Sequence, residues 1–277
     1  MKTLILCPGS YRSGTTWLHE YLTTYDCVAS TMKEPNSWLP DCVDRYPEYV
    51  RYERNSNIKA QTLIDDFWTH HNDMVTDISP SYSPVFEAED YARVKMYCES
   101  IGVGVKVIFI LRDPWTNNMS RLRAREHYTG SRLFPSEFVE TYSIDPAIIG
   151  RENLPMSSDE RANRYDLIIP EIEKVFEPED IEYIIFEEMF RWDTLENLYY
   201  FLGLPPKGEF LDKVVNHYPL IPALETNGWM NEAYNRCMNR HQKSYEFCHD
   251  RFPQTKNLWA RGITGQHRRD SSLSTPV

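Results

Sequence analysis

The sequence has no apolar run long enough to cross a membrane as a helix, and no Gly/Ser-rich linker, repeat or low-complexity block. Met1 is followed almost at once by the first predicted strand, which leaves no room for a signal peptide. The chain has 277 residues, and 41% of them are hydrophobic, which is enough for a sizeable core. We therefore expect a single α/β domain over residues 1–277, soluble and cytoplasmic, with no membrane span.

The cysteines lack the spacing of a metal site. None of the six forms a Cys-x-x-Cys pair, so we expect no zinc. Cys237 and Cys248 flank a polar segment, and either a disulfide or two free thiols would fit that spacing. A reducing cytoplasm favours the free thiols.

Basic residues are outnumbered. The chain has 30 Lys and Arg against 41 Asp and Glu, a formal net charge of −11. This balance disfavours non-specific nucleic-acid binding, so we expect no nucleic-acid partner. An anionic ligand would need a local basic pocket, and a long polyanionic acceptor would need a basic groove that the sequence does not reveal.

The lysine of a nucleotide triphosphatase P-loop is also missing. Gly9 and Gly14 have the spacing of that motif, but Thr15 occupies the lysine position, and the cation, Arg12, precedes the second glycine. A short apolar run before the loop and a helical repeat after it still indicate strand, tight loop and helix. Loop and helix N–H groups would then converge on one spot, which predicts a cradle for a phosphate or a sulfate. A kinase-like enzyme that binds ATP and Mg²⁺ stays an alternative, and the missing lysine argues against it.

A cation followed by Ser-Gly-Thr-Thr-Trp-Leu resembles the 5′-phosphosulfate loop of sulfotransferases that use 3′-phosphoadenosine 5′-phosphosulfate (PAPS). The resemblance implies a P-loop-like three-layer fold, in which helices flank a central parallel sheet. It also implies PAPS as cosubstrate and no metal. The residues that it places around the phosphosulfate are Arg12, Ser13, Gly14, Thr15, Thr16 and Trp17.

A second basic site follows the near-continuous apolar run at 105–111, which is typical of a central parallel strand. Arg112 stands at the end of that strand. Asp113 is a good N-cap and Pro114 a good first residue for the next helix. Arg112, with Ser120 on the helix, resembles the pair that grips the 3′-phosphate of PAPS in the family, where a planar guanidinium and a hydroxyl are suitable donors.

Two further segments are expected to complete the site. Arg261 and Gly262 resemble part of a C-terminal loop that covers the nucleotide in many sulfotransferases, and a disordered basic tail is the alternative. Residues 36–73 are expected to form an insertion on the acceptor side. His70 and His71 within it are expected to be surface residues rather than catalytic bases.

Glu34 is the candidate catalytic base. Residues 26–34 are expected to form the second strand, and Pro35 biases Glu34 to an extended conformation at its end. A Lys-Glu dipeptide at this distance from the loop resembles heparan-type glycosaminoglycan sulfotransferases, whose glutamate removes the proton of the acceptor. By resemblance, Glu34, Arg12 and Lys33 form the catalytic group. A solvated Lys-Glu pair at a strand end is the alternative.

The segment from Asp77 to Pro84 also resembles the heparan-type group, except that Ile78 replaces a lysine. Lys33 is a candidate substitute for that lysine. The predicted function is transfer of a sulfuryl group from PAPS to an acceptor hydroxyl or amine, with carbohydrate the favoured acceptor and protein tyrosine or a small alcohol as alternatives. An inactive module that binds the 3′,5′-bisphosphate stays a further alternative because of Ile78.

Overall fold

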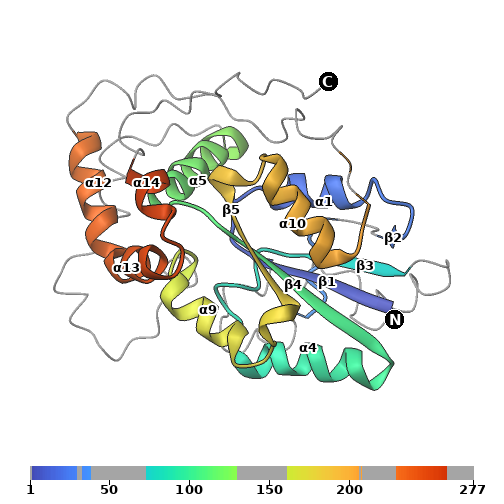
Figure 1. Ribbon diagram of the computed structural model, residues 1–277. Helices are drawn as coiled ribbons and strands as arrows, with labels where there is room; N and C mark the ends of the chain where they lie inside the picture. The colour runs from blue at the N-terminus through green and yellow to red at the C-terminus, as the bar shows by residue number, and fades with distance from the viewer. Residues whose placement is uncertain are drawn as a thin grey trace.

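The computed structural model describes residues 2–29, 33–38, 73–129, 161–205, 207 and 229–260. At its centre is a five-stranded sheet in the order β2-β3-β1-β4-β5, in which all neighbouring strands are parallel (Figure 1). The strands are β1 (Lys2–Gly9), β2 (Val28–Ala29), β3 (Met74–Ile78), β4 (Val103–Leu111) and β5 (Ile181–Ile185). Because parallel strands all end at one edge, the loops that follow β1, β3 and β4 lie together there, where open α/β sheets bind ligands.

Helices cover both faces of the sheet (Figure 1). Along β1, Leu4 and Leu6 belong to one buried cluster and Ile5 and Cys7 to another. The first cluster takes residues from α4, α9 and α13, and the second from α1 and α10. The helices are α1 (Thr15–Leu22), α4 (Ala88–Ser100), α5 (Pro114–Thr129), α9 (Tyr165–Glu173), α10 (Trp192–Leu202), α12 (Trp229–Arg240), α13 (Gln242–Arg251) and α14 (Thr255–Trp259). The predicted P-loop-like α/β fold, with helices on either side of a central parallel sheet, is confirmed.

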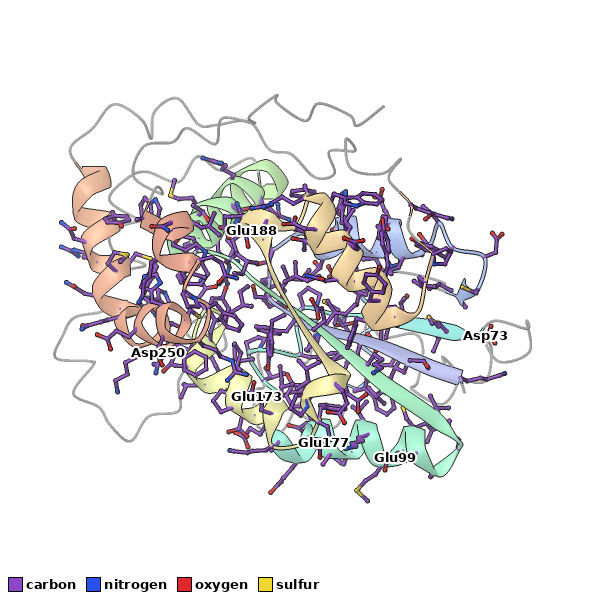
Figure 2. The ribbon with its side chains drawn as sticks, in the orientation of Figure 1. Asp73, Glu99, Glu173, Glu177, Glu188 and Asp250 are labelled. Atoms are coloured by element: carbon purple, nitrogen blue, oxygen red, sulfur yellow. The ribbon has the colours of Figure 1, made fainter. Side chains whose placement is uncertain are left out.

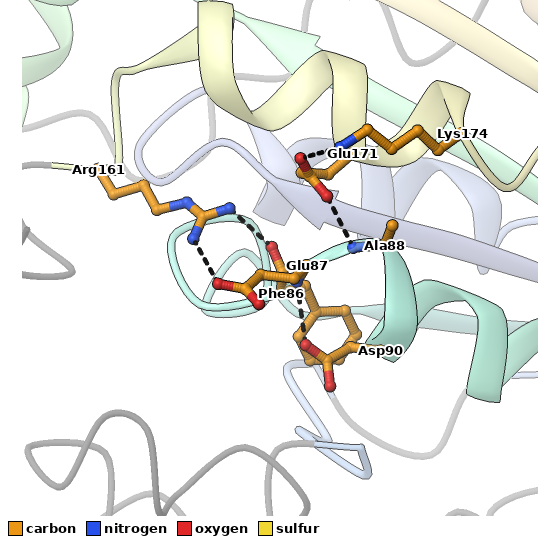
Figure 3. A network of polar contacts seen from close by, with 7 residues as sticks. All are labelled: Phe86, Glu87, Ala88, Asp90, Arg161, Glu171 and Lys174. Atoms are coloured by element: carbon orange, nitrogen blue, oxygen red, sulfur yellow. Dashed lines mark hydrogen bonds and ion pairs between the residues drawn. The ribbon is translucent and has the colours of Figure 1, made fainter. Parts of the chain in front are cut away.

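A polar network joins the start of α4 to α9 (Figure 3). Glu171 accepts a hydrogen bond of 2.9 Å from the Ala88 N–H and forms an ion pair of 2.6 Å with Lys174. Arg161 donates to the Phe86 carbonyl at 3.1 Å and lies 3.6 Å from a Glu87 carboxylate oxygen. The free N–H groups at the beginning of α4 therefore find acceptors on the neighbouring helix as well as in its own capping box.

Three exposed acidic side chains lie at the amino ends of the strands (Figure 2). Asp73 precedes β3, Glu99 lies just before β4, and Glu177 comes shortly before β5. These three carboxylates are therefore at the opposite edge of the sheet from the β1–α1 loop. Part of the excess negative charge is thus kept away from the edge where an anion would bind.

Two predicted strands are shorter in the structure. Among the described residues of the strand expected over 26–34, Val28–Ala29 form β2, and residues 33–38 lie outside the sheet. The expectation that Pro35 makes Glu34 extended is wrong, because Glu34 has a φ of 58°. Likewise β5 ends at Ile185, and a 3₁₀ turn, η4 (Phe186–Glu188), replaces its predicted last residues.

Candidate active site

The loop between β1 and α1 is built around a left-handed turn. Arg12 has a φ of 57°, and Gly14, the N-cap of α1, has a φ of 85°. A Cβ at Gly14 would lie 2.8 Å from the Met189 sulfur, so both the backbone conformation and the close packing require glycine. The first N–H groups of α1 have no partner within the helix and, with its positive dipole end, favour an anion at this turn.

Neighbouring elements hold the loop through neutral groups. Asn117, on α5, donates from its side-chain amide to the Tyr11 carbonyl and, at 3.2 Å, to the Ser13 hydroxyl. The Ser10 hydroxyl lies 2.6 Å from that of Ser13 and 3.2 Å from the phenol of Tyr165 on α9. Ser10, Ser13 and Asn117 are fully buried, so these contacts fix the loop in the interior of the fold.

The structure brings the two predicted arginines together. The Arg112 guanidinium donates to the Arg12 carbonyl, and its Nε donates to Thr116 Oγ1 at 3.2 Å. The Arg112 guanidinium also lies over the Phe186 ring at 4.2 Å. Desolvation, assisted by the charge of Arg12, lowers the pKa of Arg112 to about 10, which still leaves it charged at neutral pH. Arg112 thus carries a positive charge into the loop and connects the end of β4 to it.

Ser120 lies four residues beyond Thr116 on α5 and is half-buried. Since residues four apart share a face of a helix, Ser120 is on the same face of α5 as the Arg112 contact. The structure therefore places Arg112 and Ser120 on the same side of this helix.

A buried carboxylate stands behind Arg112. Asp113 accepts hydrogen bonds at Oδ1 from the Trp115 N–H at 3.1 Å and from the Tyr245 hydroxyl, so it caps α5 as predicted. Burial, with a contribution from nearby Glu187, raises the pKa of Asp113 to about 7. Glu187 in turn accepts from the Asp113 N–H at 3.2 Å and from the Trp259 indole at 3.1 Å. The end of β4, η4 and α14 are joined in this way.

Lys33 and Glu34 form an ion pair of 2.6 Å, and each side chain is about one third exposed. The charges of Lys33 and Glu34 both affect the pKa of His19, which lies on α1. Burial and Lys33 lower that pKa, whereas Glu20 and Glu34 raise it. The Lys-Glu pair therefore lies beside the helix that begins at the anion loop. The exposure of Glu34 leaves its carboxylate accessible to a substrate.

A second buried carboxylate, Asp77, lies at the end of β3 and is joined to the segment that carries Glu34. Asp77 Oδ1 accepts from the Ser79 hydroxyl at 2.6 Å, and Oδ2 accepts from the Tyr82 hydroxyl at 2.8 Å. The same two hydroxyl oxygens accept the backbone N–H groups of Asn36, at 3.1 Å, and Trp38, at 3.3 Å.

The remaining predicted residues fall into three groups. Thr15 is buried and Thr16 half-buried in the first turn of α1. The Trp17 side chain is in the core, where it stacks on Tyr21 with ring centroids 4.9 Å apart, so only its backbone is placed for a ligand. Arg261 and Gly262 lie outside the described residues, as does most of the expected insertion at 36–73, including His70 and His71.

Ile78, which stands where the heparan-type sulfotransferases have a lysine, occupies a position that faces the core. Its side chain is 1% exposed and belongs to the cluster formed with α1 and α10. A lysine at this position with the same orientation would bury its ammonium group among apolar side chains, at a high cost in free energy. The apolar residue is thus the one that suits this backbone.

Sequence reasoning missed Asn117, Tyr165 and Asp77 as site residues. Each lies in or beside a predicted element, but its role depends on residues far away in the chain. The Ser10–Tyr165 contact joins residues 155 apart, and the Asn36–Ser79 hydrogen bond, which links Asp77 to the Glu34 segment, joins residues 43 apart. A partial signal existed for Asp77, because its segment resembled the heparan-type group.

Among the described residues, no group of three His, Cys, Asp or Glu side chains could hold a metal ion. Within the same ranges, none of the helices combines the length and hydropathy that a membrane span requires. Cys237 and Cys248 are both buried free thiols, which confirms the favoured alternative.

Comparisons with known proteins bear on the fold. No family model and no curated protein matches the sequence. Among solved structures, a sulfotransferase from Alicyclobacillus acidocaldarius matches 86% of this chain and 95% of its own length, with a TM-score of 0.55 and 17% identity. The fold is sulfotransferase-like.

Two other solved structures with this fold match at lower TM-scores. The sulfotransferase domain of the Synechococcus PCC 7002 olefin synthase matches 86% of this chain and 94% of its own, with a TM-score of 0.43 and 16% identity. Mouse sulfotransferase SULT7A1, complexed with PAP, matches 90% and 88%, with a TM-score of 0.38 and 13% identity. At such identities the likeness concerns the fold.

Proposed function

We propose that the chain is one sulfotransferase domain over residues 1–277 that uses PAPS as its sulfuryl donor. The observation that carries the proposal is that the Arg112 guanidinium donates to the main-chain carbonyl of Arg12 at a glycine-bounded helix N-terminus, on a sulfotransferase-like fold. A lysine-free cradle with two guanidinium groups suits a donor that bears anionic groups at both its 5′ and 3′ ends.

The donor site has two parts in this proposal. The 5′-phosphosulfate takes the N–H groups of the loop and of the first turn of α1, with the Arg12 guanidinium and the hydroxyls of Ser13, Thr15 and Thr16. The 3′-phosphate takes Arg112 and Ser120, with Arg261 and Gly262 from the tail. Gly14 and the backbone of Trp17 complete the cradle.

The reaction needs one proton acceptor and stabilisation of one leaving group. The acceptor oxygen or nitrogen attacks sulfur and loses its proton to the Glu34 carboxylate, while the bond from sulfur to the bridging oxygen breaks. The electron pair of that bond stays on the 5′-phosphate, where Arg12 and the loop N–H groups stabilise the added charge. The products are the sulfated acceptor and 3′-phosphoadenosine 5′-phosphate (PAP).

The acceptor is proposed to be a carbohydrate hydroxyl or amine. The support is the Lys33–Glu34 ion pair, which matches the heparan-type dipeptide, together with the exposure of both side chains. With Ile78 buried in the core, Lys33 is the cation proposed to assist at the reacting centre. Localisation in the cytoplasm stays a prediction from the sequence.

The direct test is transfer of ³⁵S-sulfate from labelled PAPS to a panel of a desulfated heparan-type oligosaccharide, 4-nitrophenol and a tyrosine-containing peptide. Labelling of the oligosaccharide is expected. A thermal-shift titration separates the donor classes, because PAP should stabilise the protein far more than ATP with Mg²⁺. An equal response would favour a kinase-like enzyme, and PAP binding without transfer to any panel member would favour an inactive module.

A further inference from the structure

The segment that carries Glu34 does not hold itself in place. Residues 33–38 belong to no strand or helix, and both Glu34 and Asn36 have positive φ values, of 58° and 53°. Residues other than glycine adopt this conformation only when the surroundings determine it. Contacts from elsewhere in the fold must therefore help to fix the backbone around Glu34.

Those contacts come from the turn after β3. The Asn36 N–H donates to Ser79 Oγ at 3.1 Å, and the Trp38 N–H donates to the Tyr82 hydroxyl at 3.3 Å. The Asn36 side chain adds a clasp, because its amide donates to the Glu34 carbonyl at 3.0 Å while its oxygen accepts from Ser81. Two main-chain hydrogen bonds, which serve as anchors, and the contacts of the Asn36 side chain thus fix the chain from Glu34 to Trp38.

Both anchors depend on one carboxylate. A hydroxyl has a single proton, and Ser79 and Tyr82 each donate theirs to Asp77, one to each oxygen, at 2.6 and 2.8 Å. Because those protons are committed to Asp77, the lone pairs of the two hydroxyl oxygens are left to accept the N–H groups of Asn36 and Trp38. Asp77 therefore sets the direction of four hydrogen bonds.

From this arrangement we infer that Asp77 is a positioning residue, which holds the Glu34 segment through Ser79 and Tyr82. The inference rests on the proposed function for the role of Glu34, but the relay itself is a property of the fold. Asp77 touches neither donor nor acceptor, since its side chain is fully buried. Burial raises the pKa of Asp77 to about 6, against the opposing effect of its hydrogen bonds, so the carboxylate still accepts from both hydroxyls at pH 7.5.

Asp77→Asn is the sharpest substitution, because it keeps the shape and reverses one hydrogen bond. The new amide NH₂ must donate to one of the two hydroxyl oxygens. The proton of that hydroxyl then loses its acceptor and is no longer held away from the main-chain N–H, so one anchor is weakened. Ser79→Ala and Tyr82→Phe each remove one link separately. Ser83→Ala is the matched control: its hydroxyl lies in the same turn but donates to the Pro80 carbonyl, outside the relay.

The first measurement is hydrogen exchange at the amides of Asn36 and Trp38, which needs no activity. We expect both amides to be protected in the wild-type protein. Ser79→Ala should speed exchange at Asn36, Tyr82→Phe should speed it at Trp38, and Asp77→Asn should speed at least one of them, each by about tenfold or more. Ser83→Ala should change neither amide. Unchanged exchange at both amides in Asp77→Asn, or in both single-link variants if Asp77→Asn does not fold, would overturn the relay.

The second measurement asks whether the relay acts through Glu34. With labelled PAPS and the most heavily sulfated panel member, Asp77→Asn should lower kcat by about ten- to a hundredfold, the cost of a misplacement of about 1 Å. The KM for PAPS and the affinity for PAP should stay within about twofold of wild type. In a Glu34→Gln background the same substitution should have almost no further effect.

The outcomes separate the two proposals. A full loss from Asp77→Asn on top of Glu34→Gln, or no loss of kcat from Asp77→Asn alone, would overturn the positioning role while leaving sulfate transfer intact. If the wild-type protein transfers no sulfate and binds no PAP, the proposed function fails. The exchange pattern still decides whether Asp77 holds the segment.

Discussion

Asp77 and Asp113 are two buried carboxylates at the ends of the strands on either side of β1, and they serve different purposes. Each accepts a hydrogen bond from a tyrosine hydroxyl, Tyr82 for Asp77 and Tyr245 for Asp113. Asp113 uses Oδ1 to cap the helix that directly follows it, whereas Asp77 spreads its two oxygens over a turn that supports a distant segment. Asp113 thus supports the helix that follows it in the chain, with Tyr245 as a distant partner, whereas Asp77 acts through the turn after β3 on the distant segment that carries the candidate base.

This difference predicts that the two sides of the site fail in different ways. Damage on the β3 side should reduce the rate of transfer and spare the donor, because the proposed donor contacts come from the β1–α1 loop, from Arg112 after β4, from α5 and from the tail. Damage on the β4 side should weaken donor binding or change the stability of the fold. Four substitutions test this division, from the largest expected effect to the smallest.

Glu34→Gln should have the largest effect. Loss of a general base typically costs about 10²- to 10⁴-fold in rate, so kcat should fall by that factor while the affinity for PAP stays within about twofold. Glu20→Gln is the matched control, because Glu20 lies on α1 and, like Glu34, raises the pKa of His19; it should retain transfer. Retention of wild-type kcat by Glu34→Gln, measured with labelled PAPS, would show that another group takes the proton.

Asp113→Asn should change the pH dependence of stability. Burial raises the pKa of Asp113 from its usual 3.8 to about 7, so between about pH 4 and pH 7 the folded state binds more protons than the unfolded state. Stability should therefore fall as pH rises through this window, by about 1.4 kcal/mol for each pKa unit of the shift, as an upper bound. Asparagine keeps the oxygen that caps α5, so it should remove this loss.

Thermal unfolding between pH 5 and pH 8 checks that expectation. The decrease in Tm with rising pH should be smaller in Asp113→Asn than in the wild-type protein. Glu187, Glu182 and Asp77, whose pKa values burial also raises, would contribute a remaining decrease. His19, His241 and His249 act in the opposite direction below about pH 6.5, because burial lowers their pKa values. Parallel Tm curves for the two proteins would mean that Asp113 is not the group that titrates.

The same comparison explains how much the sequence could predict. Asp113 was predicted correctly as an N-cap, Arg112 as the residue at the end of a buried strand, and Gly14 as part of the tight turn between strand and helix, because their signals lie within a few residues. The long β4 also follows from a local apolar run. Local rules suffice where cause and effect are neighbours in the chain.

The support of Glu34 could not be predicted in that way. Pro35 predicts an extended Glu34, yet the long-range bonds from Ser79 and Tyr82 to the segment prevail over that local preference, and Glu34 is left-handed. Similarly, the hydroxyl of Tyr165 binds the loop from α9, although its helical spacing predicted only an apolar role. What was missed depends on pairs of residues that only the folded sheet brings together.

Asn117→Ala tests the donor side with a smaller effect. Asn117 donates to the Tyr11 carbonyl and the Ser13 hydroxyl, and the loss of one buried hydrogen-bonding partner costs about 1–3 kcal/mol. PAP affinity should fall by about tenfold, measured by calorimetry. Asn118→Ala is the matched control, because Asn118 is equally buried but contacts Asn163 and Cys237 rather than the loop. Equal losses of PAP affinity in the two variants would contradict a specific role for Asn117.

Glu171→Gln should have the smallest effect, because it changes the network between α4 and α9 (Figure 3), none of whose residues is proposed to bind donor or acceptor. Glutamine keeps an oxygen for the Ala88 N–H and loses only the ion pair with Lys174, which is worth less than about 1 kcal/mol at this exposure. Burial raises the pKa of Glu171, but hydrogen bonds from Lys174 and Ala88 outweigh it and lower the pKa overall. The contribution of Glu171 to the stability of the fold is therefore present above its unfolded pKa and lost as pH falls through the folded value.

At pH 7.5, Tm should fall by at most about 4 °C in both Glu171→Gln and Lys174→Gln, with no further loss in the double variant and with PAP affinity unchanged. A decrease in PAP affinity would mean that polar contacts outside the proposed site also shape the donor site, and the division between the two sides of the site would no longer hold.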